Sequence, residues 1–156
     1  MMFRLLLIAI ASLVAPTVAF AADSVALSSM VFVERTTADA NGRTKITLQE
    51  PKVVTPGDQL VFILNYHNRG NTPANNFVVT NPMPNAVAYQ GAADSGAEVS
   101  INGGKDWGPL SVLKVADGDG RWRSARPEDV THVRWTMKQS IPAGAQGKLS
   151  FRGIVR

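Results

Sequence analysis

Alternation of apolar and polar residues with a period of two dominates this chain. Apolar side chains occupy every second position in the run Leu60, Phe62, Leu64 and Tyr66, so they share one face of a strand. Gly153 interrupts a later stripe and indicates a β-bulge. The later stripes that follow the same rule are Val133, Trp135 and Met137, and then Leu149, Phe151 and Val155.

Turn residues separate these strands. Asn41-Gly42 joins Met30–Arg35 to Thr44–Leu48 and predicts a hairpin, because Asn and Gly accept the positive φ of hairpin turns. No helical periodicity extends beyond about two turns, although Arg126–Val130 could form a single helical turn. The remaining breaks are Pro56-Gly57-Asp58, Arg69–Pro73, Asn81–Pro84, Asn102–Gly104, Asp117–Gly120 and Pro142–Gly147.

The spacing of stripes and turns predicts an all-β fold. Seven to nine short strands fit into about 130 residues, which is typical of an antiparallel β-sandwich of immunoglobulin-like type. The chain has no cysteine, so the Cys–Trp–Cys signature of immunoglobulin domains is missing, and the prediction rests on spacing and alternation. A small closed barrel is the competing architecture.

The first 21 residues have the layout of a secretory signal peptide. Arg4 precedes the apolar run Leu5–Val14, and small residues follow up to Ala19-Phe20-Ala21, an A-x-A cleavage pattern. The apolar run is shorter than the roughly 20 residues that span a bilayer, which argues against a retained membrane anchor. We therefore expect residues 1–21 to be a signal peptide and residues 22–156 to form one β-sandwich domain in the periplasm or outside the cell.

Composition narrows the possible partners. Cleavage after Ala21, or after Ala22, leaves about 135 residues, enough for an ordinary apolar core. The absence of cysteine excludes disulfides and a lipid-modified N-terminal cysteine. The net charge is +4 for the full chain, and the basic residues are spread out rather than gathered in a stripe with aromatics. We expect no nucleic-acid partner, and no stable membrane span after signal cleavage.

Val53–Tyr89 carries a more specific pattern of turns and alternating strands. The matching residues are Pro56-Gly57-Asp58, Leu60, Phe62, Leu64, Asn68, Gly70, Ala74, Phe77, Val79, Pro82 and Pro84. This pattern resembles the repeat domain of secreted bacterial and archaeal surface proteins that is catalogued as domain of unknown function eleven. Asn81 stands where that family usually has Asp. The resemblance covers about a quarter of the chain. It implies an immunoglobulin-like fold on an extracytoplasmic protein and, because the family shares no catalytic activity, no active site.

The same segment can be interpreted physically. Its turns fix the register that keeps Phe62 out of water. We expect Asn68 and Gly70 to take left-handed backbone where the strand reverses, and Pro82 and Pro84 to stop strand pairing at a sheet corner. On this interpretation the segment is scaffold.

Ser100–Trp107 resembles the Asp-box hairpin, Ser-x-Asp-x-Gly-x-x-Trp, with Asn102 in place of the aspartate. We expect the side chains of Ser100 and Asn102 to bond turn amides while Trp107 packs over the hairpin. The motif occurs in sialidase propellers, but a propeller needs several blades and this chain has room for about one. The sequence therefore predicts a self-stabilised hairpin rather than a sugar-processing site.

The acidic, glycine-rich segment Asp117-Gly118-Asp119-Gly120 resembles the start of a calcium-binding loop. A calcium loop that starts at Asp117 would place Glu128 correctly, but Trp122 would occupy the glycine position and Arg121 a ligand position. We interpret these residues as a tight turn, with metal binding as the alternative.

Other candidate groups do not form a recognisable site. Arg121-Trp122-Arg123 predicts a buried Trp122 between two solvated arginines, with an anion or sugar platform as the alternative. His67 and His132 have no nearby cysteine or paired carboxylate and make a weak metal site. Glu128-Asp129 are adjacent and cannot both point into one cleft from a strand, which argues against an acid–base pair.

No nucleophile elbow, P-loop or dinucleotide fingerprint is present. We expect no catalytic, cofactor-binding or metal-binding residues. We predict a non-enzymatic structural or interaction module of the cell envelope or surface, with an unidentified envelope or surface protein as its partner. One alternative is a fibre subunit that adds Val25–Val33 as a strand to a neighbour, although we expect this segment to pair within its own domain. The other is a carbohydrate-binding domain, which would need exposed, coplanar tryptophans.

Overall fold

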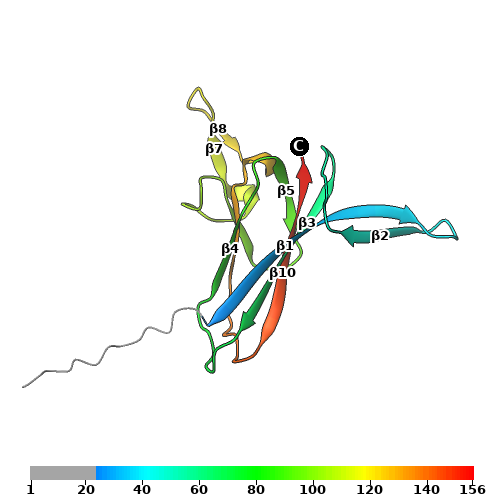
Figure 1. Ribbon diagram of the computed structural model, residues 1–156. Helices are drawn as coiled ribbons and strands as arrows, with labels where there is room; N and C mark the ends of the chain where they lie inside the picture. The colour runs from blue at the N-terminus through cyan, green and yellow to red at the C-terminus, as the bar shows by residue number, and fades with distance from the viewer. Residues whose placement is uncertain (1–23) are drawn as a thin grey trace, which may run out of the picture.

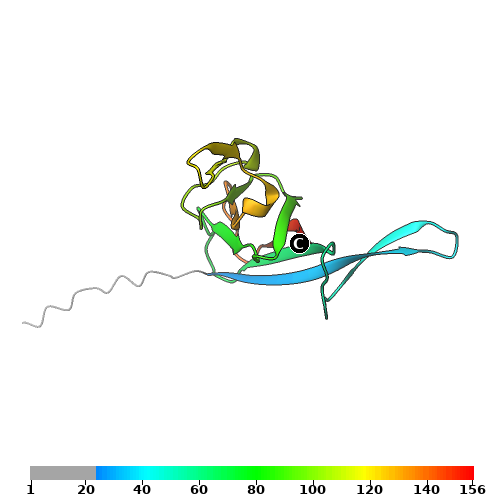
Figure 2. The same ribbon diagram turned by 90° about the horizontal axis from the view of Figure 1, so that it is seen from above.

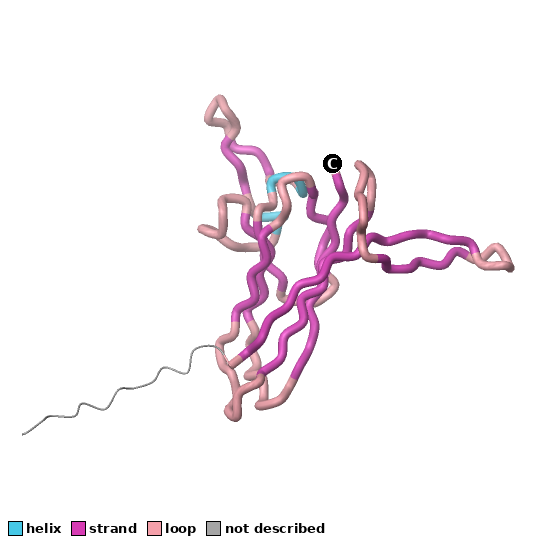
Figure 3. Tube along the Cα trace, viewed as in Figure 1, coloured by secondary structure: helices cyan, strands magenta, loops and turns pink. Residues whose placement is uncertain are grey.

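Strands and turns make up almost all of the described part of the molecule. The computed structural model describes residues 24–156, so the predicted signal peptide, residues 1–21, lies outside the described part. Two single-turn 3-10 helices, Leu110–Val112 and Pro127–Asp129, are the helical elements of residues 24–156 (Figure 3). The second confirms the helical turn expected near Arg126–Val130. Within the described range no helix could cross a membrane.

The strands form two antiparallel sheets and a separate hairpin (Figure 1). The five-stranded sheet contains, in order, β2 (Thr44–Gln49), β1 (Val25–Ala38), β3 (Gln59–Asn68), β10 (Gln146–Val155) and β5 (Val87–Ala92). The three-stranded sheet contains β4 (Val78–Pro82), β9 (His132–Thr136) and β6 (Ala97–Ser100). The hairpin pairs β7 (Lys114–Ala116) with β8 (Trp122–Ser124).

The predicted all-β, antiparallel sandwich is confirmed. Residues 24–156 form ten strands rather than seven to nine, and the short pair β7 and β8 adds to the expected set. The competing barrel is not formed by these residues, because each sheet ends in edge strands instead of closing on itself. The immunoglobulin-like connectivity remains a prediction.

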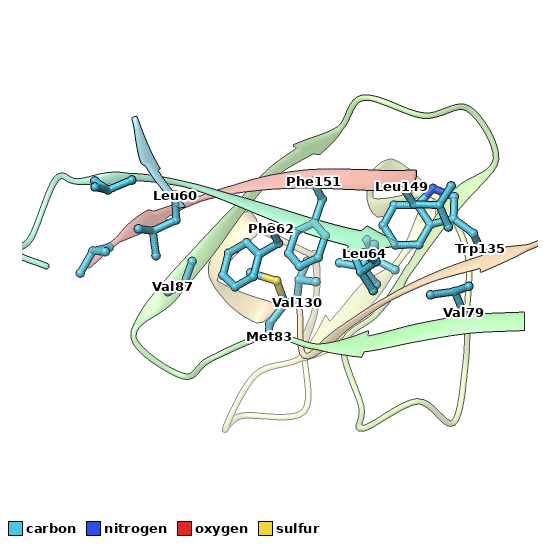
Figure 4. Close-up of a cluster of buried hydrophobic side chains, with 14 residues drawn as sticks. Leu60, Phe62, Leu64, Val79, Met83, Val87, Val130, Trp135, Leu149 and Phe151 are labelled. Carbon is cyan, nitrogen blue, oxygen red and sulfur yellow. The ribbon is translucent and has the colours of Figure 1, made fainter. Parts of the chain in front are cut away.

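The predicted apolar stripes meet between the two sheets (Figure 4). Phe62 of β3 and Phe151 of β10 stack with ring centroids 4.5 Å apart and planes within 1° of parallel. Trp135 of β9 reaches across from the other sheet, with its ring 6.1 Å from that of Phe151. Tyr66 and Met137, at the ends of their stripes, are only partly buried. Aromatic stacking across the sandwich therefore ties the sheets together.

The expected bulge at Gly153 is confirmed. The register between β10 and β5 shifts between Arg152 and Gly153. The extra residue is Gln90 of β5, because Arg152 pairs with Gly91 and Gly153 with Tyr89. β10 itself keeps its alternation, and Phe151 and Val155 are both buried.

The turn that precedes β3 follows its sequence closely. Asp58 N donates to Thr55 O at 3.0 Å across Pro56-Gly57, and Gly57 has a φ of 93°. Proline followed by a positive-φ glycine is the pattern of a type II turn. The predicted tight turn is confirmed.

The prediction for Asn68 and Gly70 is wrong. Asn68 is the last residue of β3, and Asn76, at a φ of 53°, is the single described non-glycine residue with positive φ. Glycine is needed at position 70 for another reason. A Cβ there would lie 2.5 Å from Cβ of Ser24. Close approach of two chain segments, rather than left-handed backbone, therefore selects glycine.

The two prolines lie where pairing ends. β4 is an edge strand and ends at Pro82. An edge strand tolerates proline because one side of its backbone needs no hydrogen-bond partner. Pro84 follows directly in the turn that leads to β5.

Candidate interaction surface

A long hairpin projects from the body of the sandwich (Figures 1 and 2). β1 pairs with β3 from Val25 to Val33 and with β2 from Val33 to Ala38. The hairpin from Val33 to Gln49, called the arm below, therefore has no strand of the body beside it. Its existence confirms the hairpin that Asn41-Gly42 predicts.

The tip of the arm is held by one aspartate. Asp39 Oδ1 accepts hydrogen bonds from Asn41 N at 2.9 Å and from Arg43 N at 2.8 Å. Gly42 supplies the positive φ of the turn, 74°. These local bonds fix the turn without help from the rest of the molecule.

The base of the arm is fixed to the body from both faces. Arg35 Nη1 donates to Asp58 Oδ1 at 2.5 Å, and Thr55 N donates to Asp58 Oδ2 at 2.9 Å. On the other face, Arg152 of β10 reaches across β3 to Glu34 at 2.9 Å. The direction of the arm is therefore set by ion pairs as well as by strand pairing.

The Arg35 ion pair makes stability depend on pH. The hydrogen bond from Arg35, followed by that from Thr55 N, lowers the pKa of Asp58 from 3.8 to about 2. Because the folded-state pKa is lower than the unfolded one, this stabilisation is complete above about pH 4 and is lost as pH falls through about 2. We expect Asp58→Asn to lower the thermal midpoint at pH 6, and its difference from the wild type to shrink towards pH 2. A difference that is constant between pH 6 and pH 2 would contradict this role of the charge.

Four of the nine large apolar residues that are exposed in the described range lie on or near the arm. Ile46 is 61% exposed and Leu48 is 46% exposed, both on one face of β2. Val53, at 75%, and Val54 lie in the loop that follows β2. The large apolar residues exposed elsewhere in the described range are Leu27, Met30, Val78, Val112 and Trp122. Apolar side chains gathered on a projecting element are typical of an interaction surface.

An apolar groove of about 350 Å³ opens at the base of the arm. Its walls come from Pro51–Val54 on one side and from Pro84–Val87 on the other. Phe62 and Val155 of the core lie among its lining residues, so the groove opens onto the core. The groove opens on the inner face of the sheet, with Leu60 and Phe62. Ile46 and Leu48 lie on the outer face, because they pair with Thr36 and Glu34. Pro51–Val54, the chain that leaves β2, joins the two, and together the arm and the groove form the candidate surface.

The first half of β1 has a free side. Val25–Val33 pairs with β3, as expected, but β2 reaches only to Val33. Among the described residues no strand pairs with the other side of β1 from Val25 to Val31, which is called the β1 edge below. An open strand edge is a second way of binding a protein.

The Asp-box-like hairpin behaves as predicted from its sequence. Ser100 Oγ accepts from Gly104 N at 2.9 Å, and Asn102 Oδ1 accepts from Asp106 N at 3.0 Å. Trp107 Nε1 donates to Gly104 O at 2.9 Å. The residues of the motif are thus used to stabilise their own turn.

Asp117 also serves its own turn. Asp117 Oδ1 accepts from Asp119 N at 3.1 Å and from Arg121 N at 2.8 Å. Within residues 24–156 no three His, Cys, Asp or Glu side chains gather as metal ligands would. The tight-turn interpretation therefore accounts for this segment.

The predicted burial of Trp122 is wrong. Its side chain is 70% exposed, because the hairpin of β7 and β8 protrudes from the body and no layer covers it (Figure 1). Arg123 is not simply solvated either. It forms a bidentate pair with Asp129, with distances of 2.6 and 2.7 Å, and this pair lowers the pKa of Asp129.

The three tryptophans do not form a sugar-binding platform. Trp135 is buried in the core. The guanidinium of Arg134 covers the ring of Trp107 at 4.2 Å, and His132 meets the same ring edge-on. Only Trp122 of the three presents an open ring. His67 lies on a different sheet from His132, so the structure does not bring the two histidines together.

Comparisons with protein-family models, with curated proteins and with solved structures each found no match to this chain. The geometry of this chain is therefore the only support for the candidate surface.

The sequence predicted the strands that carry this surface, but not that their apolar side chains are exposed. Ile46 and Leu48 alternate with polar residues as core positions do, so their exposure could not be read from the pattern. One signal was available. Val25–Val33 contains no charged residue and no proline, which is unusual for an edge strand.

Proposed function

We propose that this protein is an exported, non-enzymatic structural or interaction module of the cell envelope or surface, and that the arm and the groove at its base are its contact surface. The observation that carries the proposal is the projecting arm with exposed Ile46 and Leu48, which is joined through Pro51–Val54 to an apolar groove at its base. The leader-like N-terminus supports export. The partner is an envelope or surface protein with a complementary apolar surface.

The electrostatics of the described residues support a role in binding rather than in catalysis. The strongly held charged groups are ion pairs that fix structural elements, as Arg35 does with Asp58 and Arg123 with Asp129. Neither pair lines the apolar groove. Catalytic sites instead bring perturbed groups together in a cleft.

Neither alternative gains support. A fibre subunit that donates Val25–Val33 needs this segment free, whereas it pairs with β3 of its own domain. A carbohydrate-binding face needs coplanar exposed rings, whereas Trp135 is buried and Arg134 covers Trp107.

The proposal is tested by recovering the partner from the protein's own envelope with a tagged chain. We expect the wild type to retain one stoichiometric protein and the Ile46→Thr/Leu48→Thr variant to lose it. Threonine removes apolar area, and its β-branched side chain is one that strands favour. Val112→Thr is the matched control, because Val112 is 66% exposed and lies outside the arm. Recovery of glycan without protein, or equal recovery by both variants, would overturn the assignment.

A further inference from the structure

The hydrogen bonds at the two ends of β1 show which backbone N–H and C=O groups point outwards along the β1 edge. Asp39 N donates to Arg43 O, so odd-numbered residues of β1 direct their N–H and C=O groups towards β2. Arg69 N donates to Ser24 O, so even-numbered residues bond to β3. Both ladders run without a register shift. The groups that point outwards along the β1 edge are therefore those of Val25, Leu27, Ser29 and Val31.

This edge lacks the features that usually protect edge strands. Val25–Val33 contains no charged residue and no proline, and its pairing with β3 has no bulge. Leu27 is 47% exposed and Met30 is 45% exposed. Proteins normally prevent edge pairing with charges, prolines or bulges, so an unprotected edge indicates a strand that is paired in use.

The edge is also self-complementary. An antiparallel copy of the same strand with Ser28 opposite Ser28 of the second copy sets Leu27 against Ser29 and Val25 against Val31. In this register every outward N–H and C=O from Val25 to Val31 has a hydrogen-bond partner, because the odd-numbered residues of one copy lie opposite odd-numbered residues of the other. The pairing stops before Val33, whose outer side is already taken by Gln49 of β2.

We infer that two copies of this protein associate through their β1 edges, antiparallel and with the two-fold axis at Ser28, so that the five-stranded sheets become one continuous sheet. The pairing uses the same patch on both copies and therefore closes at a dimer. This inference concerns a surface other than the arm and does not rest on the proposed partner of the arm.

The register is tested by cysteine cross-linking, for which a chain without cysteine is well suited. At the two-fold axis the Ser28 residues form a non-hydrogen-bonded pair with Cα atoms about 4.5 Å apart, within the range of a disulfide. We expect Ser28→Cys to form a disulfide dimer under mild oxidation. Ser29→Cys is the matched control. Ser29 lies on the same exposed strand, but the Ser29 residues of the two copies would be diagonal neighbours, too far apart for a disulfide. The Ser29→Cys variant should therefore run as a monomer on a denaturing gel.

The pairing itself is tested by mass measurement of the purified protein in solution. We expect twice the chain mass for the wild type and loss of the dimer in Ser29→Pro. Proline removes an outward N–H, but not one that bonds to β3. Leu27→Lys, which adds an edge charge, should give the same loss if the proline variant does not fold. A wild-type monomer, a dimer that survives both substitutions, cross-linking through Ser29→Cys instead of Ser28→Cys, or an open polymer would each overturn the inference. None of these results depends on recovery of an envelope partner.

Discussion

Replacing Asn68 with alanine is expected to lower the free energy of unfolding by about 3 kcal/mol. Asn68 is fully buried, and both ends of its amide are used. Its Nδ2 donates to Thr72 O at 2.9 Å and to Ile141 O at 2.8 Å, while its Oδ1 accepts from Gly70 N at 3.0 Å. Alanine would remove all three bonds, of which the one to Ile141 O is buried and the other two are partly buried. Urea or thermal unfolding measures the loss.

Two further variants separate hydrogen bonding from side-chain size. Asn68→Asp keeps the shape and the acceptor for Gly70 N but turns a carboxylate oxygen towards two carbonyl oxygens, so we expect it to be at least as destabilising as alanine at neutral pH. Asn65→Ala is the control, because Asn65 lies on β3 with its side chain on the opposite face of the strand. The explanation would be wrong if Asn68→Ala and Asn65→Ala had similar effects.

The position of Asn68 shows what the sequence could and could not predict. Its neighbours in the alternating run Leu60, Phe62 and Leu64 are buried as expected, because a period of two assigns every second side chain to one face. Asn68 continues the same face, yet the pattern gave no reason to bury an amide there. The acceptors come from Thr72 and from Ile141, which lies 73 residues away, and only the tertiary fold brings that carbonyl into reach.

The candidate surface could be predicted less well than the fold, for a related reason. The hairpin from Thr44 to Leu48 follows from turn chemistry that is local to Asn41-Gly42. Its apolar side chains Ile46 and Leu48 pair with Thr36 and Glu34, so they lie on the face of β2 that points away from the second sheet, and they are exposed. Trp122 is exposed because no layer covers the hairpin of β7 and β8 (Figure 1). Local pattern determines which residues share a face, whereas the extent of the opposing layer determines which faces are buried.

The two interaction surfaces differ in what would recognise them. The arm and its groove present side chains, and apolar contact with them requires a partner of complementary shape. The β1 edge presents backbone groups, which any extended strand can bond, so its selectivity has to come from register and side-chain pairing. When two copies of the chain pair, both the register and the side-chain pairs are set by the sequence of β1 itself. Because the arm projects from the end of the sheet at which β2 stops beside Val33, a dimer through the β1 edge leaves the tip of each arm free.

Replacing Gly153 with alanine is expected to cost about 3 kcal/mol of stability, because the added methyl has no room. Its Cβ would lie 2.3 Å from Cγ1 of Val87 on β5 and 3.2 Å from the carbonyl oxygen of Ala88. Gly153 is the residue at which β10 shifts register against β5. The bulge thus brings the backbone of β10 against a buried valine, and glycine is required there for close packing.

A double-mutant cycle tests this steric explanation. Val87→Ala removes the Cγ1 atom that the new methyl would meet, so in that background Gly153→Ala is expected to cost only about 1 kcal/mol. Gly118→Ala is the control, because a Cβ at Gly118 meets nothing within 4 Å. It should change the unfolding free energy by less than about 0.5 kcal/mol. Equal costs of Gly153→Ala in the two backgrounds would place the strain in the backbone of the bulge instead, since Val87→Ala leaves the carbonyl of Ala88 where it is.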